Sequence, residues 1–176
     1  MDFARVLDEL TGFFTDHELR WAVIGGVAMA AYGLPRTTLD LDFVADRSAQ
    51  DAIVSHLEAQ GYRTLYRSEG YSNHRHDDAE RGRVDFVYVS GDTGELLFGH
   101  VRQVPGPGGS TIRVPGPEHV AALKVHAMAS DATRKAQELA DLRFLLTLAD
   151  IDREAVREQF IRRGMEEAWN DIAPRS

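Results

Sequence analysis

The stretch that decides the fold spans residues 21–46, where Trp21-Ala22-Val23-Ile24-Gly25-Gly26 precedes Leu39-Asp40-Leu41-Asp42-Phe43-Val44. The apolar run that stops at the two glycines predicts a short buried strand, and the alanine-rich segment 27–32 predicts a short helix. The second motif alternates apolar and acidic residues with the period of a strand. We therefore expect Asp40 and Asp42 on one face of that strand. The other face, turned into the core, is expected to carry Leu39, Leu41 and Phe43.

Two carboxylates this close on one strand face repel each other unless a cation lies between them. The pair is consistent with two structures. One is the solvent face of an edge strand, where charged side chains prevent aggregation, and the other is a metal site. Among cations Mg²⁺ fits best, because it prefers carboxylate oxygens and bridges readily to phosphates. Asp40 and Asp42 are therefore candidate metal ligands.

Two further features lie outside the acid strand. Gly25 and Gly26 stand where a strand meets a helix, so backbone N–H groups there can approach an anion such as a phosphate. The strand expected over 83–89 carries Asp85, a third acid, which either joins the metal site or pairs with Arg83. A phosphate-binding turn beside magnesium-binding acids is typical of phosphoryl or nucleotidyl transfer. In such a site Asp85 would also take the proton from an attacking hydroxyl.

Composition narrows the class of protein. The chain has 176 residues, 43% of them hydrophobic and 27% charged, which predicts one ordered globular domain with an appendage at most. It contains no cysteine, so a disulfide scaffold, a cysteine nucleophile and a thiolate zinc site are excluded. Without a long apolar run or a signal peptide, the expected location is the cytoplasm and no membrane contact is expected. The net charge of −8 argues against nonspecific coating of nucleic acid.

The remaining pattern divides the chain in two. Helices are expected over 3–18 and 48–60 and a strand over 62–66, while the polar segment 68–82 is expected to be a loop or a long hairpin turn. Within that segment His74-Arg75-His76-Asp77-Asp78 resembles a zinc motif but lacks a third ligand at a recognisable spacing, so a solvated loop is expected. Prolines and glycines cluster between Pro105 and Pro117, around a short strand over 111–114.

From Glu118 to the end the pattern is helical, with helices expected at about 118–130, 132–149 and 152–169. This layout predicts an α/β or α+β fold: a mixed sheet flanked by helices over 1–115, then a C-terminal helical bundle over 116–176.

The motifs resemble those of the DNA polymerase beta-like nucleotidyltransferase superfamily, whose signature is a Gly-Gly or Gly-Ser turn, an Asp-x-Asp strand and a later Asp. The spacer Gly33-x-x-Arg36-x-Thr38-x-Asp40-x-Asp42-Phe43 is similar to that of the AbiEii group of bacterial nucleotidyltransferases, many of them toxins of toxin–antitoxin pairs. The resemblance implies a mixed-sheet core and transfer of a nucleoside monophosphate from a nucleoside triphosphate to an acceptor hydroxyl. Two Mg²⁺ ions, or Mn²⁺ in their place, would be held by Asp40, Asp42 and Asp85.

The same resemblance implies roles outside the acids. Gly25, Gly26, Arg36 and Thr38 would bind the nucleotide. In the helical tail Glu118 and Lys124 resemble one element of the group, and Asp141-Leu142 closes another, which makes Lys124 and Asp141 nucleotide-binding candidates. Gln137-Glu138 stand where the group shows Lys-Asp. From the residues alone, Lys124 is equally well explained as a boundary lysine that extends to water.

Two classes of function follow. The first is the transferase, whose acceptor is an RNA such as a tRNA end, a small antibiotic or a protein, with a cognate antitoxin as a further partner. Arginines that recur along the last helix form either an RNA-contacting patch or a solvated helix face: Arg153, Arg157, Arg162 and Arg163. The second class is a non-catalytic module of the same fold that binds a nucleotide or a toxin–antitoxin partner.

Overall fold

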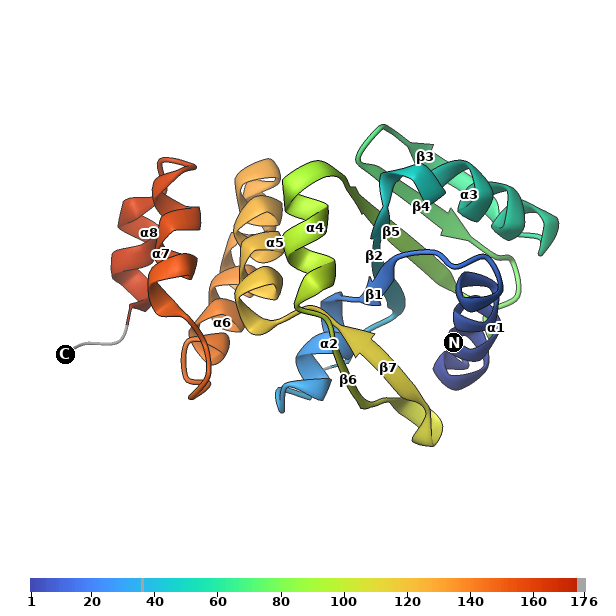
Figure 1. Ribbon diagram of the computed structural model, residues 1–176, viewed down its shortest axis with the longest axis horizontal. Coiled ribbons are helices and arrows are strands. Elements are labelled where there is room, and N and C mark those ends of the chain that lie inside the picture. The colour runs from blue at the N-terminus through green and yellow to red at the C-terminus, as the bar shows by residue number, and fades with distance from the viewer. Residues whose placement is uncertain (36, 174–176) are drawn as a thin grey trace. The chain divides into compact units, whose positions relative to one another are not determined.

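A computed structural model describes residues 1–35 and 37–173 (Figure 1). The chain divides into two compact units, Met1–Pro115 and Gly116–Ser176. Among the described residues, no helix has both the length and the apolar character that a membrane crossing needs.

The first unit alternates helices and strands up to β3, continues with the consecutive strands β4 and β5, and ends after one more helix in a hairpin (Figure 1). Its helices are α1 (Phe3–Asp16), α2 (Gly25–Ala31), α3 (Gln50–Ala59) and α4 (Gly91–Gly99), with short 3-10 turns at η1 (Arg47–Ala49) and η2 (Pro107–Gly109). Its strands are β1 (Trp21–Val23), β2 (Asp40–Asp46), β3 (Arg63–Arg67), β4 (Tyr71–Arg75), β5 (Arg83–Val89), β6 (Arg102–Pro105) and β7 (Thr111–Val114).

The main sheet has the order β1-β2-β5-β4-β3, and β6 pairs with β7 in a separate hairpin. Only β2 and β5 run parallel, and the other neighbours in the main sheet are antiparallel. The sheet is therefore mixed, and with its flanking helices it confirms the predicted α+β class. Because β5 lies between β2 and β4, segments far apart in sequence become direct neighbours in the middle of the sheet.

One face of the sheet forms the core of this unit. Leu41 and Phe43 of β2 and Val84 and Phe86 of β5 are fully buried there. They pack against apolar residues of α1 and α3, among them Phe14, whose ring lies 5.5 Å from that of Phe43 between centroids. We call this the core face. Its alternation with acidic residues is the strand period that the sequence predicted.

Three local predictions are wrong. Leu39 is 81% exposed instead of buried, because β2 begins at Asp40 and Leu39 lies before the sheet. The segment 68–82 is not a continuous loop, since its residues 71–75 form β4, and His74 is fully buried in that strand instead of lying in a solvated loop.

The second unit is helical, as predicted, but its last helix is broken. It contains α5 (Pro117–Ser130), η3 (Ala132–Arg134), α6 (Lys135–Leu145), α7 (Arg153–Ile161) and α8 (Glu166–Ile172). The expected helix over 152–169 ends before Gly164, which has a positive φ of 65° that favours glycine. Arg157 of α7 pairs with Glu154, and Arg162, directly after α7, pairs with Glu158, as on a solvated helix face. The roles of the two units as a nucleotidyltransferase core and an accessory helical region stay a prediction.

Candidate active site

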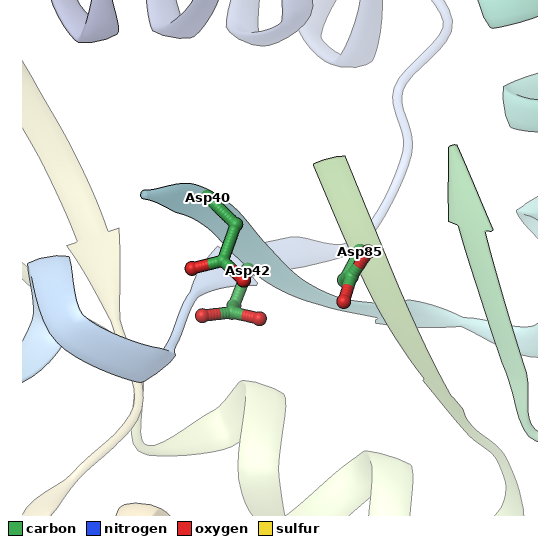
Figure 2. Close-up of side chains that lie close together, drawn as sticks. All are labelled: Asp40, Asp42 and Asp85. Atoms are coloured by element: carbon green, nitrogen blue, oxygen red, sulfur yellow. The ribbon is translucent and has the colours of Figure 1, made fainter. Parts of the chain in front are cut away.

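Three acids meet at the middle of the main sheet. Asp40 and Asp42 project from β2 and Asp85 from the neighbouring β5 (Figure 2). The parallel register sets Asp42 directly beside Asp85, and one carboxylate oxygen of each acid lies within 4.8 Å of those of the other two. The sequence could not establish this convergence, because it depends on β5 pairing with β2.

The register places further polar residues on the same face, which we call the site face. One row across the strands runs from Asp40 through Arg83 and Arg75 to Arg63. The next row contains Asp42, Asp85, Asn73 and Tyr66. The side chains from β3 and β4 were not predicted as site residues. The sequence predicts a strand at β3. In β4, however, the buried residues at alternate positions are the polar Ser72 and His74, so the apolar periodicity that identifies a strand is missing there.

Asp85 is held by two neighbours and is only 7% exposed. Arg83 donates to both of its oxygens, from Nε to Oδ1 and from Nη2 to Oδ2, each at 2.8 Å. The Tyr71 hydroxyl donates to Oδ2 at 2.7 Å. Burial, followed by the nearby Asp85 carboxylate, raises the pKa of Tyr71 to about 12, so this hydroxyl remains a donor at neutral pH. The sequence left two alternatives for Asp85: it pairs with Arg83, or it joins the other two acids. In the structure Asp85 does both.

The glycine turn fits closely against the acid strand. Gly25 has a φ of +61°, and a Cβ added there would lie 1.9 Å from Oδ2 of Asp42. A Cβ on Gly26 would lie 2.7 Å from the Cβ of Thr38. The Ile24 N–H donates to the Asp42 carbonyl at 2.9 Å, which ties the turn to β2. Both glycines are thus needed for backbone to approach this closely.

Thr38 is adjacent to the acids. Its hydroxyl donates to Oδ1 of Asp40 at 2.9 Å, so it orients that carboxylate. A pocket of about 440 Å³ adjoins Gly26 and Thr38, and its other walls are mainly apolar residues of α1, α2 and the β6–β7 hairpin. Arg36, the remaining nucleotide-binding candidate of this segment, lies outside the described residues.

Lys124 and Asp141 contact each other within the second unit. The Lys124 ammonium, which is buried, donates to Oε2 of Glu138 at 3.0 Å and to Oδ2 of Asp141. Glu138 also pairs with Arg134 at 2.8 Å. Lys124 is therefore not a boundary lysine that extends to water. It is also not a free cation, because the carboxylates of Glu138 and Asp141 both bind it. Glu118 accepts the Asp152 N–H at 2.8 Å, next to the start of α7.

Comparison with known proteins gives a family and a fold. The family model described as "Nucleotidyl transferase AbiEii toxin, Type IV TA system" matches residues 10–173. No curated protein sequence matches the chain significantly. The solved structure of the antibiotic-resistance factor ANT(2'')-Ia is similar over 97% of each chain, with a TM-score of 0.68 and 15% identity.

Two further solved structures share the fold. The lincomycin-bound lincosamide antibiotic adenylyltransferase LnuA has 14% identity and a TM-score of 0.57 over 81% of this chain and 96% of its own. A putative nucleotidyltransferase (TM1012) from Thermotoga maritima has 15% identity and a TM-score of 0.55 over 79% of this chain and 92% of its own.

Proposed function

This chain belongs to the AbiEii nucleotidyltransferase family, and we propose that it transfers a nucleoside monophosphate from a nucleoside triphosphate to an acceptor hydroxyl with the help of magnesium. The observation that carries the proposal is the convergence of Asp40, Asp42 and Asp85 beside the Gly25-Gly26 turn. Three carboxylates next to a backbone turn open to anions match what a metal-bound triphosphate requires.

The donor set fits a hard divalent cation. Each of the three acids offers one oxygen, and these oxygens lie within 4.8 Å of one another. We propose that Asp40 and Asp42 hold Mg²⁺, with Asp85 completing a two-ion site and Mn²⁺ able to substitute. When bound, the metal would neutralise the charge of the reacting phosphates.

The chain's own residues account for the remaining steps. The acceptor oxygen attacks the α-phosphorus, the bond from that phosphorus to the bridging oxygen breaks, and pyrophosphate leaves. Asp85 takes the proton of the acceptor hydroxyl, while Arg83 and Tyr71 hold its carboxylate in place. The N–H groups of the Gly25-Gly26 turn would bind the phosphates, and Thr38 orients Asp40.

The other nucleotide-binding roles remain proposals. Arg36 would neutralise the triphosphate. Lys124 would do the same only by exchanging Glu138 or Asp141 for a phosphate, because both carboxylates bind its ammonium in this structure. Asp141 would then act by holding and releasing Lys124.

We propose an RNA end as the acceptor. The support is the row Arg83, Arg75 and Arg63, which extends from the acid site across three strands of a chain whose net charge is −8. Arginines attract phosphates and would repel a polycationic antibiotic. The exposed Tyr66 stands in the adjacent row, where it can stack on a base. Within the row, Arg83 pairs with Asp85 and Arg63 with Asp77, just as Arg157 and Arg162 of the second unit pair with glutamates. The support from the row is therefore its place beside the acids, and within it Arg75 carries most of the argument.

Thermal unfolding with each nucleoside triphosphate, with and without Mg²⁺, tests the site. A ligand at 100 times its dissociation constant stabilises a fold by about 2.7 kcal/mol. We expect this magnesium-dependent shift in the wild type and its loss in Asp42→Asn. Asp46→Asn is the matched control, since Asp46 lies on the same face at the far end of β2 and should keep the shift.

Labelling assays then separate the two classes of function. Transfer of an α-labelled nucleotide to RNA, with pyrophosphate release, is expected of the enzyme. Nucleotide binding without pyrophosphate release, across RNA, antibiotic and protein acceptors, would instead indicate the binding module. A variant Asp42→Asn that transferred at the wild-type rate would show that the site is assigned to the wrong residues.

A further inference from the structure

Asp85 belongs to the acid cluster, yet a cation of the chain itself binds both of its oxygens. The Arg83 guanidinium donates from Nε to Oδ1 and from Nη2 to Oδ2, each at 2.8 Å. Whichever oxygen a metal takes, it shares that oxygen with the guanidinium. Because a Mg–O bond is about 2.1 Å long, the ion and the donating nitrogen would lie less than about 5 Å apart. Two cations this close repel each other strongly outside bulk water.

The acid is buried, whereas its cation is partly open to solvent. Asp85 is only 7% exposed, while the side chain of Arg83 is 43% exposed. The Tyr71 hydroxyl donates to Oδ2 of Asp85 at 2.7 Å independently of Arg83. Arg83 therefore has room to move into solvent, and Tyr71 would still hold the carboxylate after Arg83 had moved.

Arg83 does for the acid cluster what a metal ion does. One oxygen of each of the three acids lies within 4.8 Å of those of the other two, so the carboxylates repel one another. The guanidinium on Asp85 brings positive charge to this cluster, and a divalent ion brings twice that charge to the same place. Arg83 and the metal are thus alternative counter-ions for the same acids.

We infer that Arg83 competes with the divalent cation for Asp85 and gives up at least one of its oxygens when the cation binds. This inference rests on the proposed function and adds a control of metal affinity by a residue of the chain. The competition weakens the binding of a bare ion. It therefore favours an ion that arrives on a nucleoside triphosphate, whose phosphates also attract the released guanidinium.

The first test uses Mn²⁺ alone, titrated calorimetrically without nucleotide. Arg83→Gln should bind Mn²⁺ at least about 10-fold more tightly than the wild type, because a hydrogen bond to a charged group contributes about that factor. Arg75→Gln is the matched control, since Arg75 is the exposed register neighbour of Arg83 on β4 and its loss changes the net charge equally. Its affinity should stay within about 3-fold of the wild type, because salt screens an exposed charge.

Equal affinities in the three proteins, or weaker binding by Arg83→Gln, would overturn the inference. Adding Asp85→Asn to Arg83→Gln should abolish the gain in affinity, and a gain that persisted would also overturn it. Arg83→Lys serves if Arg83→Gln does not fold. Its ammonium lacks the fork that binds both oxygens, so it should bind Mn²⁺ more tightly than the wild type, by a smaller factor.

Melting temperatures separate competition from a purely structural ion pair. With EDTA, Arg83→Gln should melt below Arg75→Gln, because Asp85 keeps its charge and loses its cation. Saturating Mn²⁺ should close most of this gap. A gap of the same size with EDTA and with Mn²⁺ would mean that Arg83 serves only the fold.

Pyrophosphate release distinguishes a failure of this inference from a failure of the transferase. Mn²⁺ affinity that depends on Arg83, without pyrophosphate release from any nucleoside triphosphate, would support the competition and contradict the enzyme. Pyrophosphate release with Mn²⁺ affinity that does not depend on Arg83 would do the reverse. If the wild type and all variants bind no Mn²⁺, the metal site and this inference both fall.

Discussion

The two faces of β2, β5 and β4 are built from alternate residues of the same strands, yet they follow different rules. On the core face, apolar side chains are fully buried and even the polar pair Ser72 and His74 is hydrogen-bonded. On the site face, carboxylates are crowded together and Asn73 is left without a partner for its oxygen. The comparison teaches that the residues of one face stabilise this sheet, while the other face holds the energetically unfavourable residues that we propose for catalysis.

The core face should carry the largest stability effect. Phe43 is fully buried and its ring stacks 5.2 Å from that of Phe86 between centroids. Phe43→Ala should lower the free energy of unfolding by about 3–5 kcal/mol, measured by urea denaturation. Leu39→Ala, at the exposed apolar residue just before β2, should change it by less than about 0.5 kcal/mol. Similar losses in both variants would remove the distinction between buried and exposed positions.

On the site face, a substitution should affect activity strongly and stability little. Asp40→Asn should reduce the rate of pyrophosphate release by about 100-fold or more, since it removes a proposed metal ligand, while the free energy of unfolding stays equal or rises. The rise is expected because one member of a like-charged group is neutralised. Loss of folding together with activity would mean that Asp40 serves the fold.

A smaller effect on catalysis is expected at Tyr71, which contacts the proposed base Asp85 but not the substrate. Tyr71→Phe removes the hydroxyl that donates to Asp85, while Arg83 keeps its two bonds. We expect kcat to fall about 10-fold and the KM for the nucleoside triphosphate to stay unchanged, because a hydrogen bond to a charged group contributes about 1.5–3 kcal/mol. Steady-state kinetics separates the two constants, and a change confined to KM would contradict the positioning role.

The smallest effect is a change of stability with pH, which arises from His74 on the core face. Burial, which disfavours the imidazolium, lowers the pKa of His74 below its ordinary value of 6.5. The unfolded chain therefore binds this proton at a higher pH than the folded protein does, and stability falls as the pH drops below about 6.5. Urea midpoints at pH 7.5 and 5.5 should differ for the wild type and differ less for His74→Gln. His56 and His126, whose pKa values burial also lowers, should retain part of the slope.

The sequence predicted most of what local periodicity controls. The strand at Asp40–Asp46, the strand at Arg83–Val89 and the turn at Gly25-Gly26 all carry strong local signals, because apolar residues alternate with acids or stop at glycines. The strand β4 gave no such signal, since its core-facing residues are the polar Ser72 and His74. Their burial depends on partners from other strands, which no local pattern shows.

The sequence could identify the three acids of the candidate site but not the residues around them, and the catalytic role of the acids stays a prediction. Asp40, Asp42 and Asp85 were identified by spacing and by resemblance, but their meeting depends on strand order. Tyr71, Asn73 and Arg75 reach the site face only because β4 pairs with β5. The Leu39 error has a similar origin, since the pattern of alternation continues one residue beyond the point where the sheet begins.

Because β5 is central in the sheet but comes later in the sequence than its neighbours β2 and β4, the candidate site can form only after β5 has been synthesised. Asp85 leaves the ribosome later than Asp42, by about 2–9 s at the usual elongation rate of about 5–20 residues per second. Until then the growing chain lacks the strand that joins β2 to β4 in the finished sheet. A translation product that stops before this strand contains the glycine turn and two acids but lacks the third. Incomplete copies are therefore expected to be inert, and activity to begin only once the middle of the sheet is filled.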